Sequence, residues 1–195
     1  MLKDNCVRAS LGLLLCALPM AASAHTGAVE AMSFAAGFGH PIGGPDHLLA
    51  MVAVGLWAAQ MGGRAVWVVP GAFVTLMIVG GALGLVGVPM PLVQLGIIAS
   101  LLVLGGLIAT ARGLPLIWSA VLVGAFALFH GHAHGSEIPA ATSAWFYTAG
   151  FALATTCLHG LGIAVGALMR RLAWAVATRL AGGVVTLSGV WLAFV

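Results

Sequence analysis

Long apolar runs separated by short polar connections dominate the chain beyond residue 62. Five such runs cover residues 65–88, 92–111, 114–131, 144–169 and 172–195. Each is close to the roughly 20 residues that a helix needs to cross about 30 Å of hydrocarbon. The pattern therefore predicts five membrane-spanning α-helices.

The preceding segment, 28–62, is apolar at both ends and interrupted in the middle by His40-Pro41-Ile42-Gly43-Gly44-Pro45-Asp46-His47. Prolines and glycines at this density cannot continue a regular helix. A bilayer tolerates such a break only where protein or a water-filled cavity satisfies the freed backbone groups. We interpret 28–62 as one broken span. The predicted fold is all-α: a polytopic bundle of six transmembrane spans, the first broken at a Pro/Gly-rich His-Asp-His motif.

Residues 1–24 have the features of a cleavable signal peptide. Lys3 and Arg8 flank the start of an apolar core, and Ala22-Ser23-Ala24 supplies a small-residue cleavage site. The apolar core is short for a span of about 20 residues, which disfavours the alternative of an uncleaved first helix. Residues 25–195 are then predicted to form a single membrane domain.

The distribution of arginine tests the span count. A secretory signal leaves the mature N-terminus outside, and six spans then place every arginine-bearing connection inside: Arg64, Arg112, Arg170 and Arg171. The outside connections, 88–91 and 132–143, hold no lysine or arginine. This positive-inside pattern predicts a multi-pass protein of the bacterial inner membrane with both mature termini in the periplasm.

Composition agrees with a lipid environment. The chain is 62% hydrophobic and 6% charged, against roughly 25% charged residues in soluble domains. The arginines form no basic stripe, which disfavours a nucleic-acid partner. Cys157 is the only cysteine beyond the predicted signal peptide, so no disulfide framework is expected. No G-x-x-x-x-G-K-[ST] motif occurs, so the chain shows no ATP-binding site, and no ATPase subunit is evident from it.

Glycines recur at three- and four-residue spacing within two of the runs, at Gly80, Gly84 and Gly87 and at Gly162 and Gly166. Small residues at this spacing allow helices to approach closely in lipid. We expect these five glycines to lie at helix–helix contacts.

Histidines and acids gather at three places in the predicted topology. The break in the first span holds His40, Asp46 and His47. The outer end of the fourth span and the loop beyond it hold His130, His132, His134 and Glu137. The middle of the fifth span holds His159.

Asp46 is the most informative of these residues. An aspartate at the centre of a membrane helix costs about 2.5–3.5 kcal/mol on insertion scales, so it normally faces the bundle interior and has a partner. Nearly all arginines lie at the opposite edge, which leaves histidines and a metal ion as partners. A compatible alternative is that Asp46 caps a second half-helix beginning at His47.

The broken span can gather metal ligands around one point. His47 and Met51 are four residues apart and share a helix face, and His40 comes from the other side of the break. Broken helices place ion sites in this way in transporters. Imidazole suits nickel, copper and zinc, and a nearby carboxylate offsets the charge of the ion.

The second group predicts a metal-collecting mouth at the outer face. His130 and His134 form an i, i+4 pair if the helix extends that far, and His132 would bind from the loop. A merely polar loop is the alternative. His159, near mid-membrane, is a candidate relay. His25, the predicted mature N-terminus, offers an amine and an imidazole for metal capture, or is only a polar start.

These motifs resemble those of a known family. His40-Pro41-x-x-Gly44-x-Asp46-His47-x-x-x-Met51 resembles the signature of the HupE/UreJ family of nickel and cobalt permeases, and Phe129-His130-Gly131-His132-Ala133-His134-Gly135-x-Glu137 and Leu158-His159-Gly160 resemble its later motifs. The likeness extends over the whole chain. The larger nickel–cobalt transporter family has four residues between the first histidine and the aspartate where this chain has five, so its coordination geometry is not carried over.

The resemblance implies a secondary, non-ATPase permease that brings nickel or cobalt into the cell to supply metalloenzymes such as hydrogenase or urease. It implies a transport domain over residues 25–195, no enzymatic activity, and a transported ion in place of a permanently bound cofactor. The functional positions carried over by motif match are His40, Asp46, His47, His130 and Glu137.

Two other functions stay open at this point. His47 and His159 could ligate a haem iron, although an adjacent buried carboxylate has no use in such ligation. A membrane metalloenzyme with a metal-bound water is the second, and Glu137 could serve as its base. The sequence does not separate nickel from cobalt, because both accept the same nitrogen and oxygen ligands.

Overall fold

The computed structural model describes residues 29–30, 32–139 and 142–194, and all its regular structure in these ranges is helical. A first helix, Met32–Gly43, is followed by α2 (Pro45–Met61), α3 (Ala65–Leu85), α4 (Val93–Ala109), α5 (Leu116–Ser136), α6 (Ala144–Arg171) and α7 (Ala175–Leu192). The predicted all-α class is confirmed. The predicted signal peptide and His25 lie outside the described residues.

The break in the first span is narrower than the sequence suggested. The first helix continues through Pro41 to Gly43, and Gly44 alone, in extended conformation (φ −97°, ψ 115°), separates it from α2. The two helices are bent by 82°. Proline is well tolerated in the first turn of a helix, because that turn needs no N–H donors, so α2 can begin at Pro45.

The prediction that Asp46 caps a helix beginning at His47 is wrong. Gly44 is the N-cap of α2 and makes no side-chain capping hydrogen bond, and Asp46 lies within the first turn. Its Oδ1 accepts the backbone N–H of His47 at 2.9 Å. A carboxylate in a first helical turn is favourable because it faces unsatisfied N–H groups and the positive end of the helix dipole.

Four helices, α3, α5, α6 and α7, are long and apolar enough to cross a membrane, and the bent pair makes a fifth span if it counts as one. The shorter, largely apolar α4 has 17 residues, or about 26 Å of helix. These helices identify a multi-pass membrane protein.

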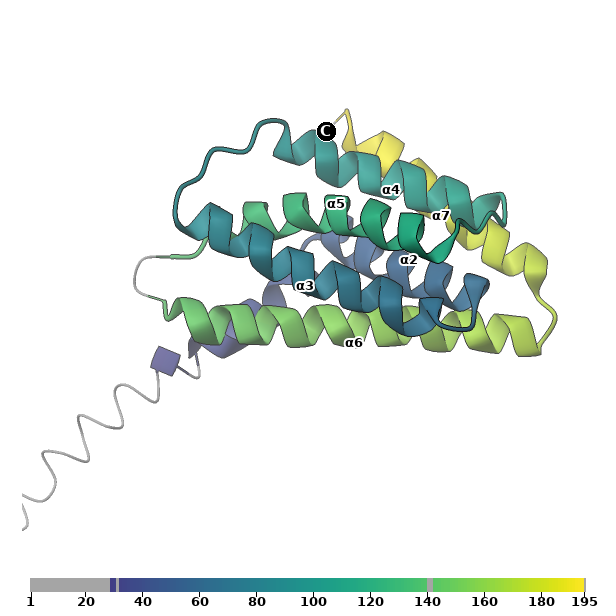
Figure 1. Cartoon of the computed structure of the whole chain (residues 1–195), viewed down its shortest axis with the longest axis horizontal. Helices are drawn as coiled ribbons and strands as arrows, with labels where there is room; N and C mark the ends of the chain where they lie inside the picture. The colour runs from purple at the N-terminus through teal and green to yellow at the C-terminus, as the bar shows by residue number, and fades with distance from the viewer. Residues whose placement is uncertain (1–28, 31, 140–141, 195) are drawn as a thin grey trace, which may run out of the picture.

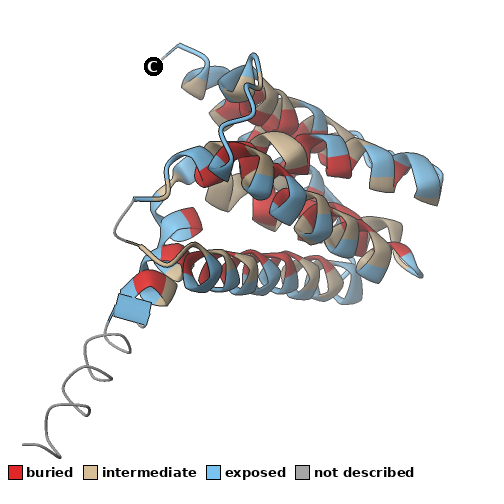
Figure 2. Ribbon diagram, turned by 60° about the vertical axis from the view of Figure 1, so that its left-hand side comes forward, coloured by how far each residue is buried: buried red, intermediate tan, exposed pale blue. Residues whose placement is uncertain are grey.

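Neighbouring helices pair across the bundle (Figure 1). α3 packs mainly on α5, α2 on α6 and α4 on α7. Trp57, Phe73 and Met77 are buried between them. The outer surface, in contrast, carries exposed large apolar side chains such as Trp67, Ile117 and Leu187, as the pale outer faces of the helices in Figure 2 illustrate. An apolar surface of this extent fits lipid rather than water.

Glycines bring the paired helices into backbone contact. A Cβ added at Gly80 would meet the carbonyl of Leu128, and one at Gly162 would meet that of Val52. A Cβ added at Gly84 would meet the carbonyl of His132, and one at Gly166 would lie 2.7 Å from the Cβ of Ala59, so four of the five predicted packing glycines are confirmed. The prediction is wrong for Gly87, which has no neighbour within 4 Å of such a Cβ and instead takes a positive φ of 75° in the turn after α3.

Candidate metal centre

Two predicted groups of histidines form one cluster at an end of the bundle. The His134 ring lies 4.5 Å from that of His40 and 4.2 Å from that of His47, measured between centroids. His47 lies 4.9 Å from His130 in the same way. The bend after the first helix brings His40 and His47 against the last turns of α5, so the cluster joins residues almost 90 positions apart in sequence.

α5 positions its histidines differently from the prediction. The helix continues to Ser136, and Gly131 and Gly135 pack it directly against the carbonyls of Met77 and Gly81 in α3. His130 and His134 are therefore a true i, i+4 pair on a helix. Both are buried, so the interpretation of an open polar loop at these positions is wrong.

The outer part of the cluster consists of His40, the buried His134 and Glu137. Donor atoms of the three side chains lie within 4.8 Å of one another, and Nε2 of His40 is 3.7 Å from Oε2 of Glu137. The Glu137 and His40 side chains are 63% and 38% exposed. Metal–nitrogen bonds of about 2.0–2.1 Å require somewhat shorter separations, which small side-chain rotations would supply.

Asp46 orients the ring of His47. Nδ1 of His47 lies 2.8 Å from Oδ1 of Asp46. An ionised carboxylate can only accept, so Nδ1 carries the proton and Nε2 keeps its lone pair. That Nε2 is buried without a hydrogen-bond partner in the described structure. A carboxylate that fixes the tautomer of a histidine in this way raises its basicity as a metal ligand.

Ser100 does the same for His130. The Ser100 hydroxyl donates to the carbonyl of Ile97 at 2.6 Å, so its single proton is used. Its 3.0 Å contact with Nε2 of His130 therefore requires that Nε2 donates. The Nδ1 atom of His130 is then unprotonated, and it is buried without a partner. The geometry leaves a nitrogen lone pair on His130 available to a cation.

His132 has another role in the structure. Its Nε2 lies 2.7 Å from the carbonyl oxygen of Val88 and donates to it. This bond ties α5 to the connection after α3. His132 takes no part in the ring contacts of the cluster, and it lies in a helix, so the expectation that it binds from a loop is wrong.

Met51 belongs to the hydrophobic core. Its Sδ accepts a hydrogen bond from the Thr155 hydroxyl at 3.3 Å. Met51 lies on the same face of α2 as His47, and its side chain packs between α2 and α6.

His159 is 1% exposed, and neither ring nitrogen has a partner in the described structure. The Phe73 ring connects it to the cluster, with its centroid 5.0 Å from His159 and 5.6 Å from His130. On its other side, His159 borders a cavity of about 410 Å³ between α3 and α6, lined also by Trp67 and Thr156.

Unpaired ring nitrogens distinguish this cluster from ordinary buried histidines. Most buried side-chain polar atoms have a hydrogen-bond partner, and each that lacks one costs about 1–3 kcal/mol. In the described structure seven buried ring nitrogens of five histidines lack one: Nε2 of His47, Nδ1 of His130, Nδ1 of His132, and both ring nitrogens of His134 and of His159. A neutral imidazole has one N–H and one nitrogen with a lone pair, so each of these rings has one lone pair to offer. A divalent cation would satisfy such lone pairs.

Sequence reasoning missed three residues at the site. Ser100 had a signal, because it is one of few polar residues in an apolar run. Tyr147, whose ring lies 6.0 Å from that of His40, is the only tyrosine of the chain. No signal in the sequence pointed to Phe73, since nothing distinguishes it from the other seven phenylalanines of the chain.

The fold and the site of the described residues define a class: an all-helical, multi-pass membrane protein with a buried histidine cluster beside a sharply bent helix pair. The chain matches the family model described as HupE / UreJ protein over residues 13–192. It is 48% identical over 173 residues to Protein HupE of Rhizobium leguminosarum bv. viciae, an alignment that covers 89% of this chain and 90% of that protein. The chain therefore belongs to the HupE / UreJ family. No solved structure matches it.

Proposed function

We propose that this chain is a secondary permease that moves nickel, or cobalt, across the bacterial inner membrane into the cell, where the ion supplies metalloenzymes such as hydrogenase or urease. Family membership supports the substrate class. The observation that carries the proposal is the set of buried histidine nitrogens that lack partners in the described structure. The ion is cargo rather than a permanent cofactor, and the chain catalyses no reaction.

The cluster provides a graded route for the ion. Glu137 and His40 form its exposed entrance, and His134 contacts both His40 and His47. His130 follows next, and beyond the Phe73 ring lies His159. Exposure falls from 63% at Glu137 to 1% at His159. In this route Asp46 acts by orienting His47 and by offsetting charge, Met51 and His132 support the site through packing and hydrogen bonding, and His25 takes part only if it reaches the entrance.

The proposed topology has six spans after removal of residues 1–24. The bent pair forms the first span, and α4 is counted as a span although it is short. The entrance then faces the periplasm and the arginine-bearing connections face the cytoplasm. Haem ligation by His47 and His159 is disfavoured, because the ring of His130 packs against His47 and the ring of Phe73 packs against both His130 and His159.

Uptake by purified protein tests the proposal. Proteoliposomes that contain the protein should accumulate radioactive nickel or cobalt with saturation, and excess magnesium should not compete, because magnesium prefers oxygen ligands and retains its water. His134→Gln should abolish uptake, since an amide lacks the metal affinity of imidazole.

His132→Gln is the matched control, because it makes the same change two residues away in the same helix. The glutamine amide can still donate to the carbonyl of Val88, so uptake should be largely retained. Uptake no faster than in protein-free vesicles would refute the proposed transport. Equal losses in the two variants would refute the assigned role of His134.

A further inference from the structure

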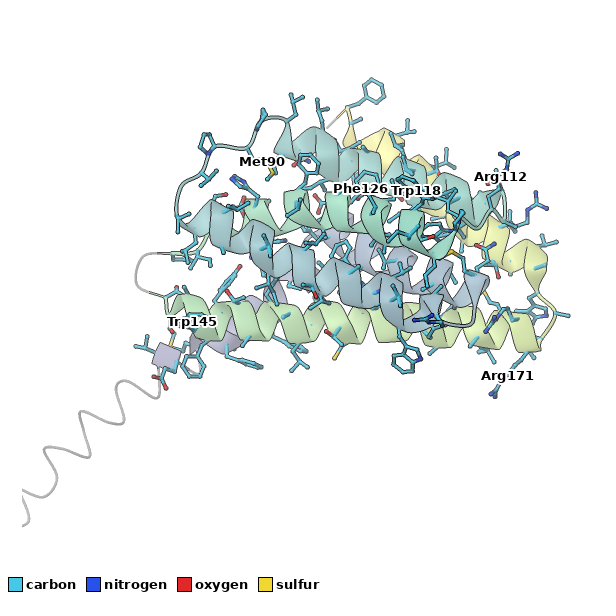
Figure 3. All side chains as sticks on the ribbon, viewed as in Figure 1. Met90, Arg112, Trp118, Phe126, Trp145 and Arg171 are labelled. Atoms are coloured by element: carbon cyan, nitrogen blue, oxygen red, sulfur yellow. The ribbon has the colours of Figure 1, made fainter. Side chains whose placement is uncertain are left out.

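The end of the bundle opposite the histidines is strongly cationic. Arg64 precedes α3, Arg112 follows α4, and α6 ends at Arg170 and Arg171; Figure 3 labels Arg112 and Arg171 at this end, far from Trp145. The carboxylate of Asp46 lies at the start of α2, about 21 Å of helix from Gln60 near its end. Among the described residues, no arginine makes an ion pair with a carboxylate.

Two of the arginines border a cavity. A space of about 310 Å³ lies where the ends of α2, α4 and α6 meet the start of α7, and its polar lining includes Gln60, Arg170, Thr178 and Arg179. Gly166 and Ala175 lie in its wall. The cavity therefore offers two guanidinium groups and no acid.

A hydrogen bond positions the guanidinium group of Arg179, and that of Arg170 lies close to the end of α2. Nε of Arg179 donates to the carbonyl of Ala109 at 2.8 Å, which leaves the two terminal NH₂ groups of Arg179 for another acceptor. Arg170 extends over the turn between α2 and α3, where a methyl group added at Gly62 would lie 3.0 Å from its Nη1. The first turn of α7, at Ala175, adds N–H groups that the helix itself does not use.

We propose that this cavity binds the phosphate of an anionic phospholipid. Guanidinium groups match phosphate oxygens with paired, charge-assisted hydrogen bonds. Basic pockets between membrane helices are suited to such headgroups. The phosphate would supply the counter-charge that the described residues do not provide for Arg170 and Arg179.

The surroundings of the cavity favour a lipid over free phosphate. Trp174, Val176 and Leu180 lie beside Thr178 and Arg179 on the start of α7, and all three side chains are largely exposed. Acyl chains of a lipid held by its phosphate would cover this apolar flank, whereas a soluble phosphate would leave it bare. Tryptophan is also typical of the membrane interface.

The bound lipid would join elements that are weakly packed. α7 packs mainly on α4 and touches α6 little, although Arg170 of α6 and Arg179 of α7 border the same cavity. A phosphate bound by both arginines would bridge the two helices. We therefore expect the lipid to stabilise the folded protein.

Thermal unfolding in a neutral detergent tests this proposal without any metal. Short-chain phosphatidylglycerol should raise the unfolding temperature by several degrees, because a ligand of the folded state stabilises it. Phosphatidylcholine, which has no net charge, and soluble glycerol phosphate, which has no acyl chains, should each give little or no shift.

Two double variants with the same change in net charge locate the effect. R170Q/R179Q should lose the shift caused by phosphatidylglycerol, whereas R64Q/R171Q, which leaves the cavity intact, should keep it. An equal shift with phosphatidylcholine would overturn the headgroup assignment, and an equal shift with glycerol phosphate would make this a free-phosphate site. If both variants lost the shift equally, the lipid would be responding to the overall positive charge of this end and not to the cavity, which would overturn the proposal. If R170Q/R179Q does not fold, the comparison of the three ligands on the unsubstituted protein still shows whether an anionic phospholipid binds in preference to the other two.

Discussion

Asp46 accepts two hydrogen bonds from its neighbour His47. Its Oδ1 accepts both the backbone N–H and the ring Nδ1–H of His47. The first contact is part of the helix start, and the second directs the Nε2 lone pair of His47 into the cluster. The structural and the chemical roles of this carboxylate can be separated, because asparagine keeps an acceptor oxygen but not the charge.

Asp46→Asn should therefore insert into the membrane normally but lose nickel and cobalt uptake by about 10–100-fold, the usual effect of removing the partner of a metal-binding histidine. His47→Gln should behave alike, since its amide does not replace imidazole. The measurement is accumulation of radioactive nickel and cobalt in cells, normalised to membrane-inserted protein. Wild-type uptake by Asp46→Asn would exclude a charge-based role.

A substitution at Ser100 separates its hydrogen bond to His130 from its contribution to packing. Ser100→Ala removes the acceptor for Nε2–H of His130, so the tautomer of His130 is no longer fixed. The concentration of nickel that half-saturates uptake should rise. Ser119→Ala is the control, because Ser119 is equally buried but bonds only to backbone carbonyls and a methionine sulfur. A similar rise in both variants would point to packing instead.

At this scale the sequence identified most of the cluster but not its chemistry. His40, His47 and His134 were found because polar residues stand out in apolar runs. Which ring nitrogen of His130 is available depends on Ser100, and which of His132 is available depends on Val88; both partners lie far away in sequence. Such partners follow only from the packing of α4 and α3 against α5.

Among the elements, the contact between α3 and α5 holds the cluster in place. Gly131 lies directly against the carbonyl of Met77 and adjoins His130 and His132. Any side chain here must push the two helices apart, and the histidines of α5 would move with them.

Gly131→Ala should destabilise the protein by about 1–3 kcal/mol or more, since overpacking against backbone has no easy relief. Gly106→Ala in α4 is the matched control: nothing lies within 4 Å of its added methyl, and alanine favours helix over glycine by about 1 kcal/mol. Thermal unfolding in detergent should show a lower midpoint for the first variant and an unchanged or higher one for the second. A harmless Gly131→Ala would contradict the close approach.

The helices themselves were largely predictable, but two of their ends were not. Hydropathy falls at Gly131, so the apolar pattern ended the span there, although α5 continues to Ser136. Likewise, the prolines and glycines from Pro41 to Pro45 suggested a long unwound stretch, yet Gly44 alone leaves the helical conformation. In both cases tertiary packing sustains helix where local composition argues against it.

For the whole molecule, the gathering of arginines at one end predicts the orientation in the membrane. With the arginine-bearing end in the cytoplasm, six spans place the C-terminal end of α7 in the periplasm. A C-terminal alkaline phosphatase fusion should be active, and a reporter that functions only in the cytoplasm should be inactive there. The reverse result would eliminate the six-span count, and α4 would be the first helix to reconsider.

Hydropathy does not predict which helices pack against one another. Lipid tails are as apolar as leucine, so an apolar face does not say whether it meets lipid or another helix. Glycine spacing correctly marked contacts in α3 and α6, but the partners, α5 and α2, followed only from the structure.

The histidine route carries its carboxylates, Glu137 and Asp46, only at its entrance. In the proposed route, an ion that moves on toward His159 would meet neutral side chains among the described ones, so it would keep its double charge, and its passage would be an electric current. A charge crossing 100 mV gains about 2.3 kcal/mol, so the resting voltage of a bacterium, negative inside, draws a dication inward with about 4.6 kcal/mol. That voltage alone can sustain a concentration ratio above about a thousandfold, so the proposed permease would need no ATP to accumulate a trace metal.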